Sequence, residues 1–419
     1  MNPSVKPGFY GWKNVGLLFL IYMSTLGMVF YGFSVIFPMM IKTLGWSRGS
    51  ASIAHTICTL LMGFGVPLAA ICINKIGARK TILIGTSLLL FGLVLLGTVT
   101  SEMWQWIILW GFVVGTGFAF CGVVPIQTIL MYWFNINRGT AIGLVMTGAA
   151  AGGFLAQPFY TWLMEQTGTW QVGWLTGAGF ALVGLIASFL LIGKPQDVGQ
   201  YSDGLSPEKA AAAGENVKRT KTYRTHAAWE FREALKTRTL WFFIATIVGH
   251  IMILFMITSH GVLHFTDKGF TEMEAASVLS FVILGSGLAR FPVGWLGDRV
   301  EPRWIISATL GIMLVMFIGL WKLTDLTFVI TAGMILGFCY GSQLIMFPTL
   351  LGNYYGVEAF ASINGIVGPT VVFFGAMVPV GAGFIFEKTG SYQTAFLLLS
   401  IILGMAFIAS LFMNPPKKE

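Results

Sequence analysis

The sequence predicts an all-α membrane protein in which twelve transmembrane helices form two pseudo-symmetric six-helix halves. Of its 419 residues, 56% are hydrophobic and 10% are charged, whereas a soluble domain carries about 25% charge. The mean hydropathy is +0.78, and so much apolar surface requires lipid around the chain. This composition excludes a soluble enzyme, a nucleic-acid-binding domain and a disordered chain. Short segments repeated at a constant spacing indicate the two halves.

Twelve apolar runs divide the chain. A helix that spans a membrane needs about 20 apolar residues, and charged residues or glycine and proline breaks separate runs of that length. The runs lack the alternating polarity of membrane β-strands, so we expect helices. The predicted spans are 14–41, 50–73, 80–99, 103–133, 139–164, 171–193, 240–265, 272–296, 303–321, 326–354, 360–386 and 391–413.

A polar stretch between the sixth and seventh runs separates the halves. Its first part is rich in Gly, Ser, Ala and Pro, which is typical of a flexible linker. Its last part, 225–236, places Phe231 and Leu235 on one face, which predicts an amphipathic helix along the membrane surface. The predicted units are an N-terminal half at 1–193, a cytoplasmic loop at 194–238 and a C-terminal half at 239–419.

The distribution of positive charge predicts the orientation of the chain. If the N-terminus is cytoplasmic, the cytoplasmic segments hold nineteen Lys and Arg residues and the opposite segments hold five. Cytoplasmic loops of membrane proteins carry such an excess. We therefore expect both termini in the cytoplasm and the chain in the cell inner membrane. The net charge of +8 is then an orientation signal and requires no nucleic acid as a partner.

Several segments recur in the two halves. The heptapeptide EQTGTWQ that begins at Glu165 matches EKTGSYQ, which begins at Glu387, at an offset of 222 residues. Duplicated halves joined by a polar loop are typical of transporters, whose substrates bind near the membrane midplane between the halves. Three glycines match at the same offset, namely Gly111, Gly115 and Gly143 with Gly333, Gly337 and Gly365.

Arg290 is the one basic residue that falls deep inside an apolar run. A charge at the centre of a bilayer costs at least about 2.5–3.5 kcal/mol, so it has to face the bundle interior, a hydrated path or a partner. All acidic residues fall in loops or at run ends. An unpaired guanidinium can hold a carboxylate through two parallel hydrogen bonds. We interpret Arg290 as the receptor for a small anion, with bonding to backbone carbonyls as the structural alternative.

Four histidines lie in or near the apolar runs. Histidine titrates near neutral pH. His55 and His250, the more interior pair, are candidates for proton or substrate handling, with packing as the alternative. His260 and His264 share a helix face near the expected outer mouth. Because no third metal ligand accompanies them, we expect a hydrated rim there and no metal site.

Polar residues inside the runs are candidates for a pocket. Tyr31, Tyr340 and Asn364 lie where exposure to lipid is unfavourable, so they line a pocket or bind helices together. The sequence has no phosphate loop, no paired membrane carboxylates and no nucleophile–base pair. We therefore expect neither an enzyme nor a cofactor.

Three groups of motifs carry a resemblance to a known family. The segments 74–80 and 294–299 look like a loop motif, and Tyr10-Gly-Trp12 like an entry motif of the first helix. Tyr132-Trp-Phe134, the stretch 138–143 (RGTAIG) and the stretch 148–153 (GAAAGG) look like a signature of the fifth helix. Over nearly its whole length the chain thus resembles the major facilitator superfamily and, within it, the monocarboxylate transporter family.

The resemblance implies a secondary active transporter that works by alternating access. Arg290 occupies the place of the family's carboxylate-binding arginine, which implies L-lactate or pyruvate, carried with a proton, as the substrate. Family members of the animal type have an aspartate one turn earlier, where this chain has Ser286, and a lysine where this chain has Met39. Ser286 is therefore a further candidate for substrate binding. We expect a monomer in the lipid bilayer.

Three alternatives stay open. An organic-anion antiporter of the oxalate/formate type belongs to the same branch of the superfamily. A channel would show flux that does not saturate and no counterflow. A membrane sensor would bind the anion without moving it.

Overall fold

The structure is a computed structural model that describes residues 8–134, 138–204, 222–225, 229–297 and 299–417. Over these ranges it is helical and contains no strand. Eleven helices are long and apolar enough to cross a membrane, and a bent pair of helices supplies the twelfth span. The predicted all-α membrane fold with twelve spans is confirmed on this count.

The first half contains six spans, several of them interrupted. α2 ends at Gly45, whose φ of 67° is left-handed, and Ser47 then caps α3 by accepting a hydrogen bond from the Ser50 amide. The second span bends by 48° between α3 and α4. The elements are α1 (Gly11–Tyr22), η1 (Met23–Phe30), α2 (Tyr31–Leu44), α3 (Arg48–Phe64), α4 (Val66–Ile76), α5 (Ala78–Val99), α6 (Met103–Trp106), η2 (Ile107–Val114), α7 (Gly115–Cys121), α8 (Val123–Trp133), α9 (Arg138–Thr167) and α10 (Trp170–Leu190).

The segment between the halves forms short helices in its described part: η3 (Pro195–Val198), η4 (Ser202–Gly204) and α12 (Phe231–Lys236). The helix expected over 225–236 begins only at Phe231, because Glu230 and Glu233 form a capping box there. Residues 226–228 of that expected helix lie outside the described residues. Next to α12, the Trp229 ring packs edge-on against Tyr355 at 5.4 Å. This end of the segment therefore rests on the second half.

The second half contains the remaining six spans. It consists of α13 (Arg238–Asp267), α14 (Glu272–Gly297), α15 (Pro302–Lys322), α16 (Leu326–Thr389) and α17 (Gln393–Leu411). α16 holds two spans, because Gly356 has a φ of 76° and interrupts the helical geometry between them. Asp325 begins α16 by accepting a hydrogen bond from the Phe328 amide.

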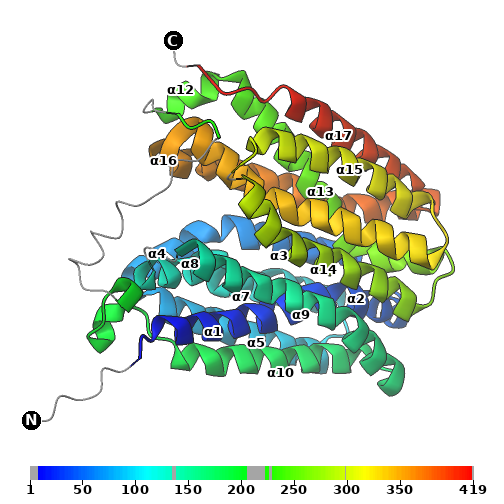
Figure 1. The fold of residues 1–419 in the computed structure, drawn as a ribbon. Helices are drawn as coiled ribbons and strands as arrows, with labels where there is room; N and C mark the ends of the chain where they lie inside the picture. Colours follow the sequence, from blue (N-terminus) through cyan, green and yellow to red (C-terminus); the bar gives the residue numbers. More distant parts are fainter. Residues whose placement is uncertain (1–7, 135–137, 205–221, 226–228, 298, 418–419) are drawn as a thin grey trace, which may run out of the picture.

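The two halves lie side by side with their helices roughly parallel (Figure 1). α1 begins and α17 ends at the same end of the bundle, which we call the termini end. The opposite end, where α2 ends and α3 begins, we call the far end. The halves contact each other through α3 with α16, α9 with α14, and α2 with α13. Residues at these contacts are the ones that any movement between the halves must rearrange.

Candidate functional site

Arg290 lies on α14 at the contact with α9 of the first half. Its side chain is half-buried, and its Nη1 donates a hydrogen bond to the backbone carbonyl of Met146. The Nε atom is buried without a hydrogen-bond partner. Among the described residues, no carboxylate forms an ion pair with this guanidinium. The carbonyl contact considered from sequence is therefore present, but it leaves part of the donor capacity of Arg290 unused.

Three tyrosines surround the charge of Arg290. Tyr31 and Tyr340, both expected to shape the pocket, lie close enough to Arg290 to interact with it electrostatically. Tyr22 does so as well, and sequence reasoning missed it. Nine residues separate Tyr22 from Tyr31, about two and a half turns of an α-helix, which would place them on opposite faces.

The π-helix η1 accounts for the electrostatic interaction of both tyrosines with Arg290. It fills the whole interval between Tyr22 and Tyr31. A π-helix closes its hydrogen bonds from i to i+5 and turns less per residue than an α-helix, so the two side chains come back toward one face. The hydrophobic period of the sequence does not reveal this switch from α-helix to π-helix, so the position of Tyr22 could not be predicted from it.

A cavity of about 380 Å³ lies next to this group and between the halves. Tyr22 lines it and also interacts electrostatically with Arg290, whereas Arg290, Tyr31 and Tyr340 are not among its lining residues. Asn364 of α16 lines it from the second half, and Thr25, Met62 and Cys121 from the first. Asn364 therefore lies at the same cavity as Tyr22.

Ser286 is buried one turn before Arg290, at a close approach of α14 to α16. A Cβ added at Gly341 of α16 would lie 2.1 Å from the Ser286 carbonyl oxygen. The serine therefore occupies a contact where the two backbones nearly touch.

His250 and His55 lie in different surroundings. The His250 ring stacks on Tyr340, with centroids 4.5 Å apart, and its Nε2 lies 3.4 Å from the Tyr340 carbonyl oxygen. His250 is thus tied to a tyrosine of the Arg290 group. His55 stacks on Phe33 at 3.9 Å, and its Nδ1 accepts a hydrogen bond from Trp110 at 3.3 Å. The partners of His55 are thus aromatic side chains of the first half.

The expected hydrated rim at His260 and His264 is wrong. The two residues are 0% and 7% exposed. His264 packs its ring against Phe396 of α17 at 4.3 Å, and His260 contacts Tyr392, which precedes α17. Burial here results from packing between distant segments, which helical periodicity within α13 does not reveal.

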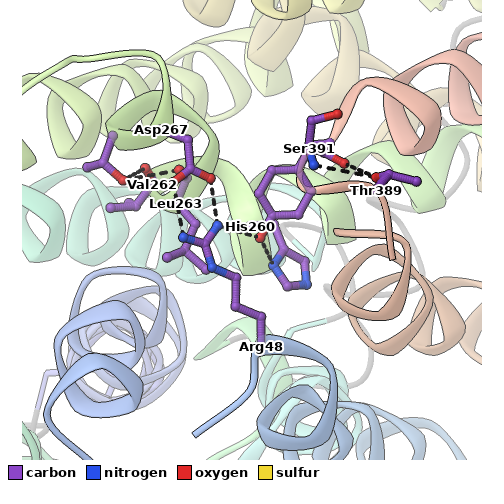
Figure 2. A network of polar contacts seen from close by, with 9 residues as sticks. Arg48, His260, Val262, Leu263, Asp267, Thr389 and Ser391 are labelled. Carbon is purple, nitrogen blue, oxygen red and sulfur yellow. Dashed lines mark hydrogen bonds and ion pairs between the residues drawn. The ribbon is translucent and has the colours of Figure 1, made fainter. Parts of the chain in front are cut away.

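A polar network closes the far end between the halves (Figure 2). The guanidinium of Arg48 donates to both carboxylate oxygens of Asp267, at 2.6 and 3.0 Å. It also donates to the Tyr392 hydroxyl at 3.3 Å. Glu387 accepts a hydrogen bond from the Gly49 amide at 2.6 Å. We call these five residues the latch, and sequence reasoning missed it although Glu387 and Tyr392 lie in the repeated heptapeptide.

The backbones at the latch also come close together. A Cβ added at Gly383 would lie 2.7 Å from the Cα of Gly49. Toward the membrane centre, the Thr56 hydroxyl donates to the Ala376 carbonyl at 2.8 Å. At the far end, α3 of the first half is therefore bonded to α16 and α13 of the second half.

The comparisons with known proteins agree with this architecture. The sequence profile of the Major Facilitator Superfamily matches residues 18–284 and 263–419. Monocarboxylate transporter 2 of Homo sapiens is 25% identical over 441 residues, which cover 97% of this chain and 86% of that protein. Monocarboxylate transporter 12 of Rattus norvegicus is 24% identical over 439 residues, covering 97% and 87%.

Solved structures share the fold. A point mutant of the nucleoside transporter NupG superposes with a TM-score of 0.71 at 15% identity and covers 95% of this chain and 99% of that one. A bacterial homologue of the human lysosomal transporter Spinster, inward-facing and unoccupied, gives a TM-score of 0.67 at 18% identity, covering 98% and 95%. These proteins are transporters and not enzymes. The chain therefore belongs to the Major Facilitator Superfamily, and its curated relatives there are monocarboxylate transporters, as its motifs predict.

Proposed function

We propose that the chain carries a small monocarboxylate such as L-lactate or pyruvate across the membrane, together with a proton, by alternating access. The observation that carries the proposal is Arg290, a half-buried guanidinium at the contact between the halves with a buried, unpartnered Nε. Relatives with the name monocarboxylate transporter support the substrate class.

The substrate carboxylate binds Arg290 through two parallel hydrogen bonds, one of them from the unused Nε. Tyr22, Tyr31 and Tyr340 supply hydroxyls around it, and Asn364 reaches the substrate from the cavity wall. A cavity of about 380 Å³ is within the range of ligand sites and has room for a three-carbon acid. Ser286, one turn from Arg290, is a further candidate for contact with the substrate and adds no charge beside the arginine.

Arg290 also connects binding to movement. Its bond to the Met146 carbonyl joins α14 to α9, that is, one half to the other. An anion that takes over this donor releases the bond and neutralises the charge, so the empty and loaded carriers favour different arrangements. Substrate shifts the equilibrium between the two open states by its differential affinity for them.

Among the described residues no carboxylate pairs with Arg290, and Ser286 and Met39 stand where animal-type members have an aspartate and a lysine. His250, tied to Tyr340, and His55 are the candidates within the spans for carrying the proton. From the excess of Lys and Arg at the termini end we infer that this end faces the cytoplasm, and we propose the cell inner membrane as the location of the chain. A monomer contains both halves and the complete site.

Uptake of labelled L-lactate into proteoliposomes tests the proposal. With an inward proton gradient, we expect accumulation above the equilibrium level, and without a gradient only equilibration. Neutral Ser286 and Met39 favour one alternative, exchange of organic anions without a proton. Exchange against internal anion without gradient-driven accumulation would establish that antiporter, and non-saturating flux without counterflow would establish a channel.

A further inference from the structure

His260 lies in a chain of hydrogen bonds that ends at the latch. Arg48 donates to the Tyr392 oxygen at 3.3 Å, the Tyr392 hydroxyl lies 2.9 Å from His260 Nδ1, and His260 Nε2 lies 2.7 Å from the Pro379 carbonyl oxygen. Figure 2 shows Arg48 reaching Asp267 beside the His260 ring. The chain thus joins α3 of the first half to α13 and α16 of the second.

The chemistry of the two end groups fixes the direction of every bond in this chain. A guanidinium can only donate and a carbonyl oxygen can only accept. Burial raises the pKa of Tyr392, so its hydroxyl keeps a proton to donate. His260 therefore donates from Nε2 to Pro379 and accepts from Tyr392 at Nδ1. The closed latch requires the neutral, Nε2-protonated form of His260.

A proton added to His260 is incompatible with this arrangement. Both ring nitrogens would then donate. The Tyr392 oxygen would face two donors, Arg48 and His260, while its own hydrogen would lose its acceptor. A second positive charge would also be enclosed beside Arg48, where the ion pair with Asp267 already balances the first.

Other ionisable groups around the ring do not remove this conflict. Glu387 is held by the Gly49 amide, and His264 lies one turn along α13 against Phe396. His55 on α3 interacts electrostatically with His260 but is packed among aromatic rings. Among the described residues, the titratable and charged groups that interact with His260 are Arg48 and His55 on α3, Asp267 on α13 and Tyr392 before α17. His264 lies on α13 as well, and Glu387 lies on α16, which packs against α13.

We propose that His260 is a proton-binding site that opens the far end: the neutral ring closes the latch, and the protonated ring releases Arg48 from Tyr392. A cavity of about 750 Å³ at the far end is lined by Arg48 and Asp267, which gives water a route to the latch. The inference rests on the proposed proton-coupled transport. It adds a proton site to a chain whose positions 286 and 39 lack the family's ionisable residues.

The distance between the halves at the far end, measured without substrate, tests this inference. Spin labels on ketone-bearing non-natural residues at the exposed positions 43 and 388 leave the native cysteines in place. Double electron–electron resonance on the protein in nanodiscs then reports the separation of α2 and α16. We expect a longer-distance population to grow as the pH falls from about 8 to about 4, through and below the range in which an exposed histidine titrates.

Three variants identify the group that titrates. Glutamine at position 260 can accept from Tyr392 and donate to Pro379 but cannot gain a proton, so His260→Gln should keep the short distance at every pH. Tyr392→Phe retains the ring and removes the hydroxyl, and should also lose the pH response. His264→Gln, the matched control one turn away, should respond like the wild type.

A wild-type distance that is independent of pH would overturn the inference, and so would a His260→Gln variant that opens like the wild type. If His260→Gln does not fold, as judged by size-exclusion chromatography, the Tyr392→Phe variant replaces it in the test. A Tyr392→Phe variant that opens with falling pH like the wild type would then overturn the inference. Because no substrate is present, failure of L-lactate uptake would contradict the proposed transport and leave this measurement unaffected.

Discussion

Arg290 and Tyr22 differ in what the sequence reveals about them. Arg290 is recognisable from the positions of the charges alone, since no other Lys or Arg falls deep inside an apolar run. Tyr22 is not, because its side chain reaches Arg290 only through the π-helix η1. His260 shows a second kind of feature that the sequence does not reveal, its burial. Its burial depends on Tyr392 and Pro379, which are more than a hundred residues away in sequence.

Removing the charge of Arg290 should abolish transport without unfolding the chain. A hydrogen bond to a charged group contributes about 1.5–3 kcal/mol, so Arg290→Gln should lower L-lactate uptake by about tenfold or more. The control is Arg232→Gln, which removes an exposed arginine on α12. Uptake at unchanged rate by a folded Arg290→Gln variant would rule out the proposed carboxylate receptor.

Tyr22 should affect substrate affinity. Tyr22→Phe removes one hydroxyl near Arg290, and loss of one hydrogen bond of about 1 kcal/mol predicts a KM for L-lactate that is raised about fivefold. Tyr160→Phe is the matched control, because the Tyr160 hydroxyl is buried and has no hydrogen-bond partner. Equal KM values for both variants would place Tyr22 outside the binding site.

At the scale of elements, two of the three repeated glycine pairs mark equivalent helix contacts in the two halves, whereas nothing lies within 4 Å of a Cβ added at Gly143. A Cβ at Gly115 of α7 would lie 2.8 Å from Cys58 Cα on α3, and one at Gly337 of α16 would lie 1.8 Å from the Val282 carbonyl oxygen on α14. Small residues allow such close approach of membrane helices. The sequence match at an offset of 222 residues thus has a physical basis, although it does not say which helices meet.

Filling the α14–α16 contact should destabilise the fold. Gly337→Ala forces the backbones apart, and overpacking typically costs about 1–3 kcal/mol. We expect a lower Tm and less monodisperse protein. Gly352→Ala on the same helix is the control, since nothing lies within 4 Å of the added Cβ, and it should leave the Tm unchanged or raise it. A Tm for Gly337→Ala as high as that of the control would contradict the close contact.

For the whole molecule, the repeat predicts two similar halves but not how they close on each other. The two copies of the heptapeptide have diverged at the latch. Glu387 and Tyr392 bond to the first half, whereas Trp170, at the position equivalent to Tyr392, has no hydroxyl. The latch is therefore built from one copy only. Composition and periodicity determine the twelve helices, but a contact between halves depends on their relative placement.

The ion pair of the latch should set the balance between closed and open far ends. Its partners are 22% and 34% exposed, so the pair contributes up to about 1 kcal/mol and is weakened by salt. Asp267→Asn should therefore raise the open population about fivefold. The double variant Arg48→Asp with Asp267→Arg should recover part of the closed population, because the charges are again opposite.

The salt concentration supplies an independent check on the equilibrium between the closed and open far ends. Raising the ionic strength from about 0.1 M to about 1 M shortens the Debye length from about 10 Å to about 3 Å. Wild-type protein, measured with the spin labels at positions 43 and 388, should then open toward the level of Asp267→Asn, while the variant itself should respond little. If wild type and variant instead shift equally with salt, other contacts, such as that of Glu387 with Gly49, hold the far end closed. Such a result would remove Arg48 from the closing mechanism and with it the route by which His260 acts.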